Sequence, residues 1–209
     1  MLLDPVAFNA FLAEMGQQVD WRVASACPCR SPRSGAADAA CPQCHGIGYY
    51  WAEAQRCLVA LSGQKTQAEW AKFGLWENGD QVVTLPSDSL AYAMGQFDRL
   101  TMVQSSIPFR VVLRPGDTLR DQVVSVNQAT WFSNSALVTA NAPPEVGEDG
   151  TTLVWPGDSP PADTQVALSG RKRPEYYCLQ EFPQDRAHHG GRDLPRRVVL
   201  RRFDLLGRT

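Results

Sequence analysis

QVVTLPSDSLAYAMGQFDRLTMVQSSIPFRVVLRPGD, residues 81–117, is the stretch of sequence that sets the fold class. Its β-forming residues gather at 81–85, 99–103 and 109–113, and the turn-forming residues 114–117 follow the last group. The pattern continues at 122–126, 136–140, 152–155, 164–168, 175–181 and 197–203. Short strands at intervals of about ten residues predict a mainly β protein, a small antiparallel barrel or sandwich, rather than alternating βαβ units.

The N-terminal part of the chain has a helical pattern. Asp4 supplies an N-cap acceptor and Pro5 suits the first helical position, so we expect a helix over residues 5–19. A strand is expected within 49–61 and a second, short helix over 66–73, with Thr66 as its cap. The predicted organisation is an N-terminal helix in residues 1–23, a cysteine-containing loop in 24–50, and a β-rich domain with long loops in 51–209.

The composition is that of an ordinary globular protein. Hydrophobic residues make up 44% and charged residues 20% of the 209 residues, which excludes a disordered chain. No apolar run approaches the roughly 18 residues of a membrane helix, so we expect no membrane partner. The first residues also lack the pattern of a secretory signal peptide. In a reducing compartment, the six cysteines favour metal ligation over disulfides.

Four cysteines form the most informative motif. Cys27 and Cys29, then Cys41 and Cys44, lie in a segment rich in Pro, Ser, Gly and small residues that cannot fill a core. Two close pairs of thiolates can surround one ion tetrahedrally, and zinc suits such a set. The glycines after Cys44 free the backbone to adopt positive φ. We therefore predict a structural zinc site that stabilises this loop.

The ligand set has alternatives. The spacing Cys27-x-Cys29 is shorter than the two to four intervening residues of most zinc sites, so His45 or Cys57 can replace one member. Otherwise Cys57 and Cys178, which have apolar and aromatic neighbours, are expected in the core. The stretch Cys41–Gly48 resembles one zinc knuckle of DnaJ-type domains, but it occurs once here, whereas those domains repeat it.

Basic residues are concentrated at the end of the chain. Residues 171–209 carry ten Lys and Arg against five Asp and Glu, and the first 170 residues carry ten against seventeen. This asymmetry predicts an interaction of the C-terminal segment with nucleic acid or with an acidic neighbouring subunit. The alternative is a solvated pair of strands. The candidate interaction residues are Arg171, Arg173, Arg192, Arg196, Arg197, Arg201 and Arg202.

No established catalytic motif is present in the sequence. It contains no phosphate-binding loop, nucleophile elbow or HExxH metalloprotease signature. A set of four thiolates closes the coordination shell of zinc and leaves no position for a reactive water, which disfavours a metal-dependent hydrolase. The pair His188-His189 lies in a Gly-rich segment that is expected to be a loop. We therefore predict that the protein is not an enzyme.

The combination of these features resembles a class of structural proteins from tailed bacteriophages and prophages. The matching features are the N-terminal helix, the cysteine loop that ends in Gly48-Tyr49-Tyr50, and several motifs further along the chain. These motifs are residues 73–80, 81–86, 97–101, 173–177 and 194–198. The resemblance covers most of the chain.

This resemblance implies a role in assembly rather than catalysis. Proteins of this class have β-barrel cores and form rings at the head-to-tail junction, as neck or stopper proteins. The expected partners are copies of the same chain, the neighbouring portal-adaptor or tail proteins, and DNA in the channel. The expected location is the virion, after assembly in the bacterial cytoplasm. A tail or baseplate protein is the first alternative, and a zinc-dependent nucleic-acid-binding protein is the second.

Overall fold

The computed structural model describes residues 4–62, 64–72, 74, 76–157, 159–182 and 188–206. The chain divides into two compact units. The barrel unit comprises Met1–Gln104 and Glu175–Thr209, and the inserted unit comprises Ser105–Pro174. The predicted boundaries at residues 23 and 50 do not coincide with the boundaries of these two units. The chain divides where contacts are few, and the strands before and after residues 105–174 belong to one barrel.

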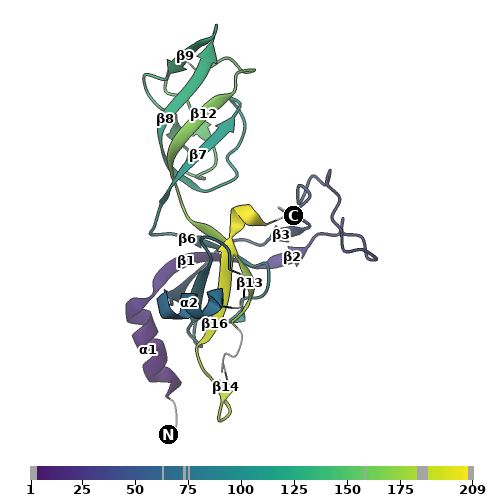
Figure 1. Ribbon diagram of the computed structural model, residues 1–209, viewed down its shortest axis with the longest axis vertical. Coiled ribbons are helices and arrows are strands. Elements are labelled where there is room, and N and C mark those ends of the chain that lie inside the picture. Colours follow the sequence, from purple (N-terminus) through teal and green to yellow (C-terminus); the bar gives the residue numbers. More distant parts are fainter. Residues whose placement is uncertain are drawn as a thin grey trace. The chain divides into compact units, whose positions relative to one another are not determined.

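A closed barrel of six antiparallel strands forms the centre of the barrel unit (Figure 1), which confirms the prediction of a mainly β protein. Each strand pairs with two neighbours. In barrel order the strands are β1 (Gln17–Arg22), β4 (Gln55–Leu61), β5 (Gln81–Leu85), β16 (Arg196–Arg202), β13 (Glu175–Glu181) and β6 (Arg99–Met102). Alternate residues of these strands, among them Val19, Val59 and Leu100, fill the core.

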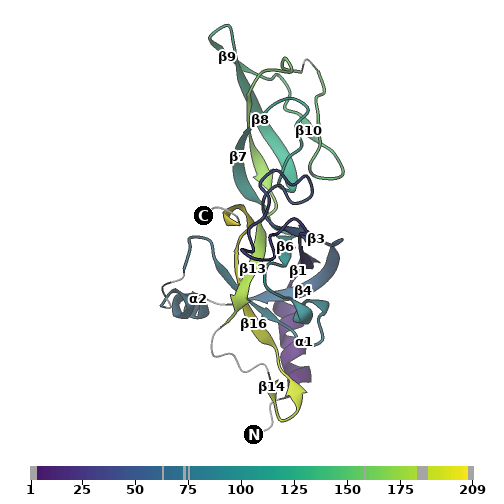
Figure 2. The same ribbon diagram turned by 90° about the vertical axis from the view of Figure 1, so that its right-hand side faces the viewer.

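The helix α1 (Pro5–Met15) begins as predicted, with Asp4 accepting a hydrogen bond from the backbone N–H of Val6. It ends earlier than predicted, because Gly16 has extended backbone and residues 17–22 form β1. A Cβ at residue 16 would lie 2.6 Å from the side chain of Leu58, so glycine allows α1 to pack closely on β4 (Figure 2). Met15 and Val19 are four residues apart, which is about one helical turn, so the sequence pattern extended the predicted helix into β1.

Short elements complete the barrel unit. The second helix, α2 (Gln64–Ala71), begins two residues before the predicted cap, so Thr66 lies inside it. Phe73, the predicted last residue of this helix, lies outside the described residues. The remaining elements are the strands β2 (Ala24–Ala26), β3 (Tyr49–Trp51), β14 (His188–His189) and β15 (Arg192–Asp193) and the 3-10 helices η1 (Leu90–Ala93) and η2 (Phe203–Leu205). The segment around His188 is thus a small hairpin rather than a loop without strands.

The inserted unit contains an antiparallel sheet of four strands, in the order β7-β12-β8-β9. These strands are β7 (Ile107–Leu113), β12 (Val166–Lys172), β8 (Val123–Ser133) and β9 (Ala136–Thr139), and β10 (Glu145–Val146) pairs with β11 (Leu153–Val154). Phe109, Val166 and Leu168 belong to its own core. Asn134 and Ser135 both have positive φ and join β8 to β9 in a two-residue turn.

A β-bulge bends the centre of this sheet. Ser169 pairs with Gln128 but Gly170 pairs with Val126, so Asn127 of β8 is the extra residue. At Gly170 a Cβ would lie 2.1 Å from the carbonyl oxygen of Ser125. The bulge therefore requires glycine at this position of β12.

Gly170→Ala should destabilise the inserted unit by about 3 kcal/mol, because the backbone of β8 must move to make room for the added methyl group. Gly157→Ala is the matched control, since nothing lies within 4 Å of a Cβ there and its φ is not positive. The measurement is urea unfolding, followed by hydrogen exchange of peptides from β8 and β12. Equal stability of the two variants would contradict the close approach at Gly170.

Candidate metal centre

The structure brings together the four predicted cysteines. The Sγ atoms of Cys27, Cys29, Cys41 and Cys44 all lie within 4.8 Å of one another. Cys27, Cys41 and Cys44 are buried and Cys29 is half-buried, although the surrounding loop has almost no other apolar side chain to pack on them. Such a cluster can hold one metal ion.

The separations between the sulfurs fit tetrahedral coordination. The Sγ atoms of Cys29 and Cys44 are 3.5 Å apart, and those of Cys27 and Cys41 are 3.8 Å apart. Four sulfurs at about 2.3 Å from a central zinc ion would lie about 3.8 Å from one another. A disulfide needs an S–S distance of about 2.05 Å, so all four thiols are free, as are Cys57 and Cys178. The cluster therefore fits a metal ion with four thiolate ligands.

Tight turns place the two cysteine pairs. Arg30 N–H donates to the carbonyl of Cys27, and His45 N–H donates to the carbonyl of Cys41. His45, Gly46 and Gly48 have φ of 49°, 83° and 83°, which confirms the predicted positive φ of the glycines after Cys44. The backbone N–H of Cys27 then donates to the carbonyl of Gly48, which closes the loop at its base.

The pKa values of two cysteines of the cluster are shifted in opposite directions. Hydrogen bonds from the backbone of Cys44 and Gln43 lower the pKa of Cys41 to about 7. A backbone hydrogen bond from Asp38 also lowers the pKa of Cys29, but burial and the three other thiols outweigh it and raise that pKa to about 12. One thiol of the cluster is thus ready to lose its proton near neutral pH, and a cation would be needed to hold all four as thiolates.

The two alternative ligands lie elsewhere. Cys57 is buried in the core of the barrel, as is Cys178, which confirms the predicted core positions. The pKa of the Cys57 thiol is raised to about 11, mainly because the thiol is buried. His45 is exposed and is not a member of the group that the structure brings together.

The base of the loop is held against the barrel by contacts that sequence reasoning missed. The carboxylate of Asp98, which is 3% exposed, accepts hydrogen bonds from the backbone of Ala24 (2.7 Å), the indole of Trp21 (2.9 Å) and the backbone of Gly95 (2.9 Å). Asp98 therefore joins β2 to the strands β1 and β6. An Asp–Trp pair separated by 77 residues leaves no local pattern in the sequence.

Aromatic rings continue this connection. Tyr49 of β3 stacks on Phe97 at 4.3 Å between centroids, and Phe97 stacks on Tyr177 of β13. The guanidinium of Arg30 lies 4.8 Å over the ring of Tyr49. In Figure 1 the cysteine loop is the irregular segment that leaves β2 and returns at β3. Folding of the loop is thus linked to the barrel through a short aromatic stack.

The predicted arginine surface is divided between the two units. Arg171 and Arg173 belong to the inserted unit, and the other five belong to the barrel unit. Arg171 donates to the hydroxyl and the carbonyl of Ser106. Arg192 is exposed on β15. The seven predicted arginines therefore come from both units, two from the inserted unit and five from the barrel unit.

Most of the barrel arginines are engaged within the fold. Arg201 binds the buried carboxylate of Asp80 with two hydrogen bonds, at 3.0 and 2.9 Å. Arg196 donates to Glu181 and to the carbonyl of Met94. Arg202 pairs with Asp204, and Arg197 lies over the ring of Phe182 at 4.5 Å. The charge count in the sequence did not show that these side chains have internal partners.

No known protein-family model matches this chain, and no curated protein matches it at a significant level. Within the described residues, no helix is long and apolar enough to cross a membrane.

Replacing a cysteine of the cluster should remove the metal. Cys41→Ser and Cys44→Ser each leave three thiolates, so we expect bound metal to fall from about one ion per chain to less than about a tenth of that under mild chelation. The measurement is elemental analysis of the purified chain. Cys57→Ser is the control and should keep its metal. Equal metal content in all variants would refute the ligand assignment.

Proposed function

We propose that this chain is a structural, non-enzymatic subunit of a tailed-phage particle, a ring-forming protein of the neck that joins head and tail. Its partners in this proposal are copies of itself and the neighbouring portal-adaptor or tail proteins. The sequence resemblance supports this class. The structural observation that carries the proposal is the exposed apolar surface of α1.

The helix α1 exposes side chains that water solvates poorly. The exposed fractions are 73% for Val6, 49% for Phe8, 59% for Phe11 and 65% for Met15. Only Asn9 and Leu12 of this helix are buried. A helix that is apolar on nearly all sides is normally covered, and clustered exposed apolar groups mark interaction surfaces. This favours a protein that functions in contact with another protein.

Closure of the barrel restricts how such a contact forms. Every barrel strand already has two neighbours, so no barrel edge is free to pair with a strand from another chain. Association through the barrel itself must therefore use side chains rather than strand pairing. A rigid barrel with an apolar helix on its surface suits a subunit that docks in a defined orientation.

The metal of the cysteine cluster is, in this proposal, zinc with a structural role. Four thiolates in tetrahedral arrangement suit zinc, and they leave no open position for catalysis. When bound, zinc would hold together a loop that has almost no apolar core of its own. The zinc ligands would be the Sγ atoms of Cys27, Cys29, Cys41 and Cys44, whose mutual distances fit one zinc ion. Elemental analysis should find zinc; iron at one equivalent instead would overturn this assignment.

The arginines do not add support for the nucleic-acid-binding alternative. Arg196, Arg201 and Arg202 make ion pairs within the fold, so their charge is partly neutralised before any ligand arrives. Phosphate contacts depend on unneutralised Lys and Arg. The exposed apolar helix is better explained by a protein partner.

Deleting the gene in the phage that carries it tests the proposal. We expect negative-stain images of separate tails and heads that have lost DNA, and we expect the wild-type gene supplied in trans to restore joined particles. Intact infectious particles without the protein would contradict the proposal. Attached tails with an incomplete tip would instead show the tail or baseplate alternative.

A further inference from the structure

We propose that α1 of one copy docks into a groove on the outer face of the sheet β7-β12-β8 in the inserted unit of the next copy. This inference rests on the proposed self-assembly and names the two surfaces that meet. The helix supplies apolar side chains and one acidic group. The groove supplies small residues, apolar walls and one basic group.

The helix has the spacing of a groove-binding ligand. Phe8, Phe11 and Met15 lie at positions i, i+3 and i+7, which places them in one stripe along α1, beside the side that Asn9 and Leu12 bury on the barrel. At about 1.5 Å per residue the stripe is about 10 Å long. Glu14 is the only ionisable side chain within α1, and it makes no ion pair in the described residues.

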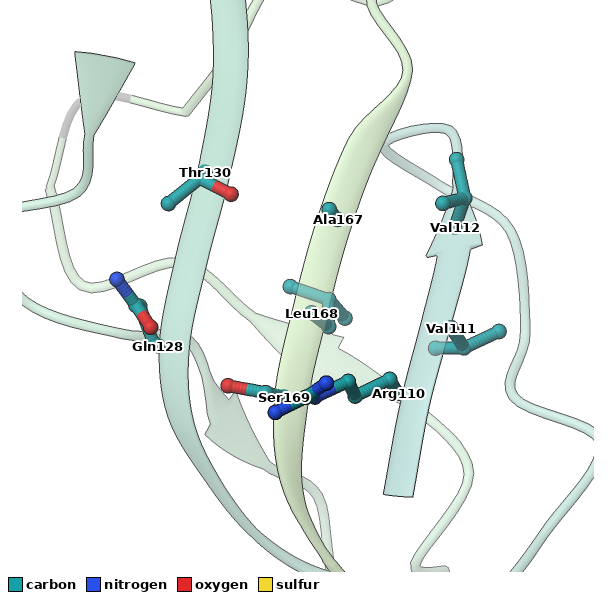
Figure 3. A pocket seen from close by; sticks show the side chains of 8 residues that line it. All are labelled: Arg110, Val111, Val112, Gln128, Thr130, Ala167, Leu168 and Ser169. Atoms are coloured by element: carbon teal, nitrogen blue, oxygen red, sulfur yellow. The ribbon is translucent and has the colours of Figure 1, made fainter. Parts of the chain in front are cut away.

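The groove lies on the side of the sheet opposite to the core of the inserted unit. The residues Phe109, Leu168 and Ala129 point into that core, and their neighbours along each strand lie on the other face. On that outer face, the paired residues of β7, β12 and β8 form two rows that run across the strands. One row is Arg110, Ser169 and Gln128, and the other is Val112, Ala167 and Thr130, as Figure 3 shows.

The shape of this face suits an inserted side chain. Ala167 and Ser169 on the central strand are small, and larger residues stand on the strands at either side, which leaves a hollow of about 400 Å³. Val112 is 60% exposed, although it is apolar. Beyond Thr130, Phe132 lies opposite Leu137 of β9 on the same face, and both are more than 60% exposed. The hollow therefore continues into an uncovered apolar surface.

Dimensions and charge favour α1 as the occupant. Three neighbouring strands span about 10 Å from the first to the third, which matches the length of the helix stripe. Arg110 borders the hollow, is exposed, and makes no ion pair in the part of the chain that the structure describes. It can pair with Glu14 when Phe11 occupies the space over Ala167. Electrostatic complementarity of this kind fixes the register of a docked helix.

Two different surfaces that meet make a head-to-tail contact. Such a contact repeats from copy to copy and closes into a ring when the rotation allows. Pairing of α1 with a second α1 would stop at a dimer and would leave the hollow on the sheet uncovered. The helix-in-groove contact is therefore the one that builds an assembly of several copies.

Sedimentation of the purified full chain tests this contact. Wild type should form species larger than a dimer as its concentration rises. Phe11→Ala should weaken association about 30-fold, as expected for a central apolar anchor. Val6→Ala, on the same helix but outside the stripe, should weaken it less than threefold. Equal effects of these two variants, or a wild type that stays monomeric, would overturn the proposal.

A variant of the groove provides the second test. Ala167→Arg should abolish association by filling the hollow, and Ala162→Arg, in an exposed loop of the same unit, should leave association unchanged. Glu14→Arg and Arg110→Glu should each weaken association about tenfold, and the double variant should recover most of the loss. Arg120→Glu is the control for charge. Failure of the double variant to recover would contradict the Glu14–Arg110 pair.

Photo-crosslinking identifies which chain is bound. A photoreactive phenylalanine at position 11, in a mixture of ¹⁴N and ¹⁵N chains, should crosslink to β7, β12 or β8 of a chain with the other isotope. Crosslinks to a second α1, or within one chain, would overturn the proposal. These experiments use the purified chain and no phage particle. If they show no contact between α1 and the groove, the proposed role in the neck is still tested separately by the gene deletion. Conversely, particles that assemble without the protein would refute the neck role while leaving the measured contact intact.

Discussion

Closure of the six-stranded barrel is the constraint on which the rest of the barrel unit depends. The barrel closes because β1 pairs with β4 on one side and with β6 on the other. All pairs are antiparallel, and most connections join strands that are neighbours in the barrel. Each such connection can be lengthened without disturbing the hydrogen bonds of the strands. The cysteine loop, α2, the hairpin β14-β15 and the inserted unit all lie in connections of this kind.

The two longest connections illustrate this principle. Thr101 of β6 pairs with Glu175 of β13, so the residues between them replace what would otherwise be a hairpin turn. This connection is long enough to form the inserted unit with its own core. Ala26 of β2 pairs with Tyr49 of β3, and the residues between them form the cysteine loop. The loop lacks a core, and the cluster of thiols takes the place of one.

The sequence predicted those features that depend on local pattern. The strand at 175–181 has the predicted bounds, and the four cysteines come together as their spacing indicated. The predicted helix extends into residues 17–19 of β1 because Val19 continues the helical spacing, whereas the period-two alternation of Val19 with Trp21 is the pattern that indicates a strand. The inserted unit, the hydrogen bonds of the Asp98 carboxylate and the pair of Arg201 with Asp80 depend on contacts between residues far apart in the sequence. No local pattern encodes those contacts.

The way the cysteine loop is attached to the barrel indicates how a metal in the loop would serve the proposed role in assembly. The loop reaches the barrel through Asp98 and the stack of Tyr49 on Phe97, and its thiols lie apart from the barrel core. A metal ion bound by the four thiols should therefore order the loop without being needed to close the barrel. Such a division would give an assembling subunit a rigid centre and separately stabilised contact regions.

Hydrogen exchange of the native chain, with and without a chelator, measures whether the barrel folds independently of the metal. We expect amides of β1, β4, β5, β16, β13 and β6 to share the slowest exchange and to keep it after the metal is removed, while residues 27–48 lose their protection. If chelation accelerates exchange in the barrel strands as much as in the loop, the barrel does not fold independently of the metal.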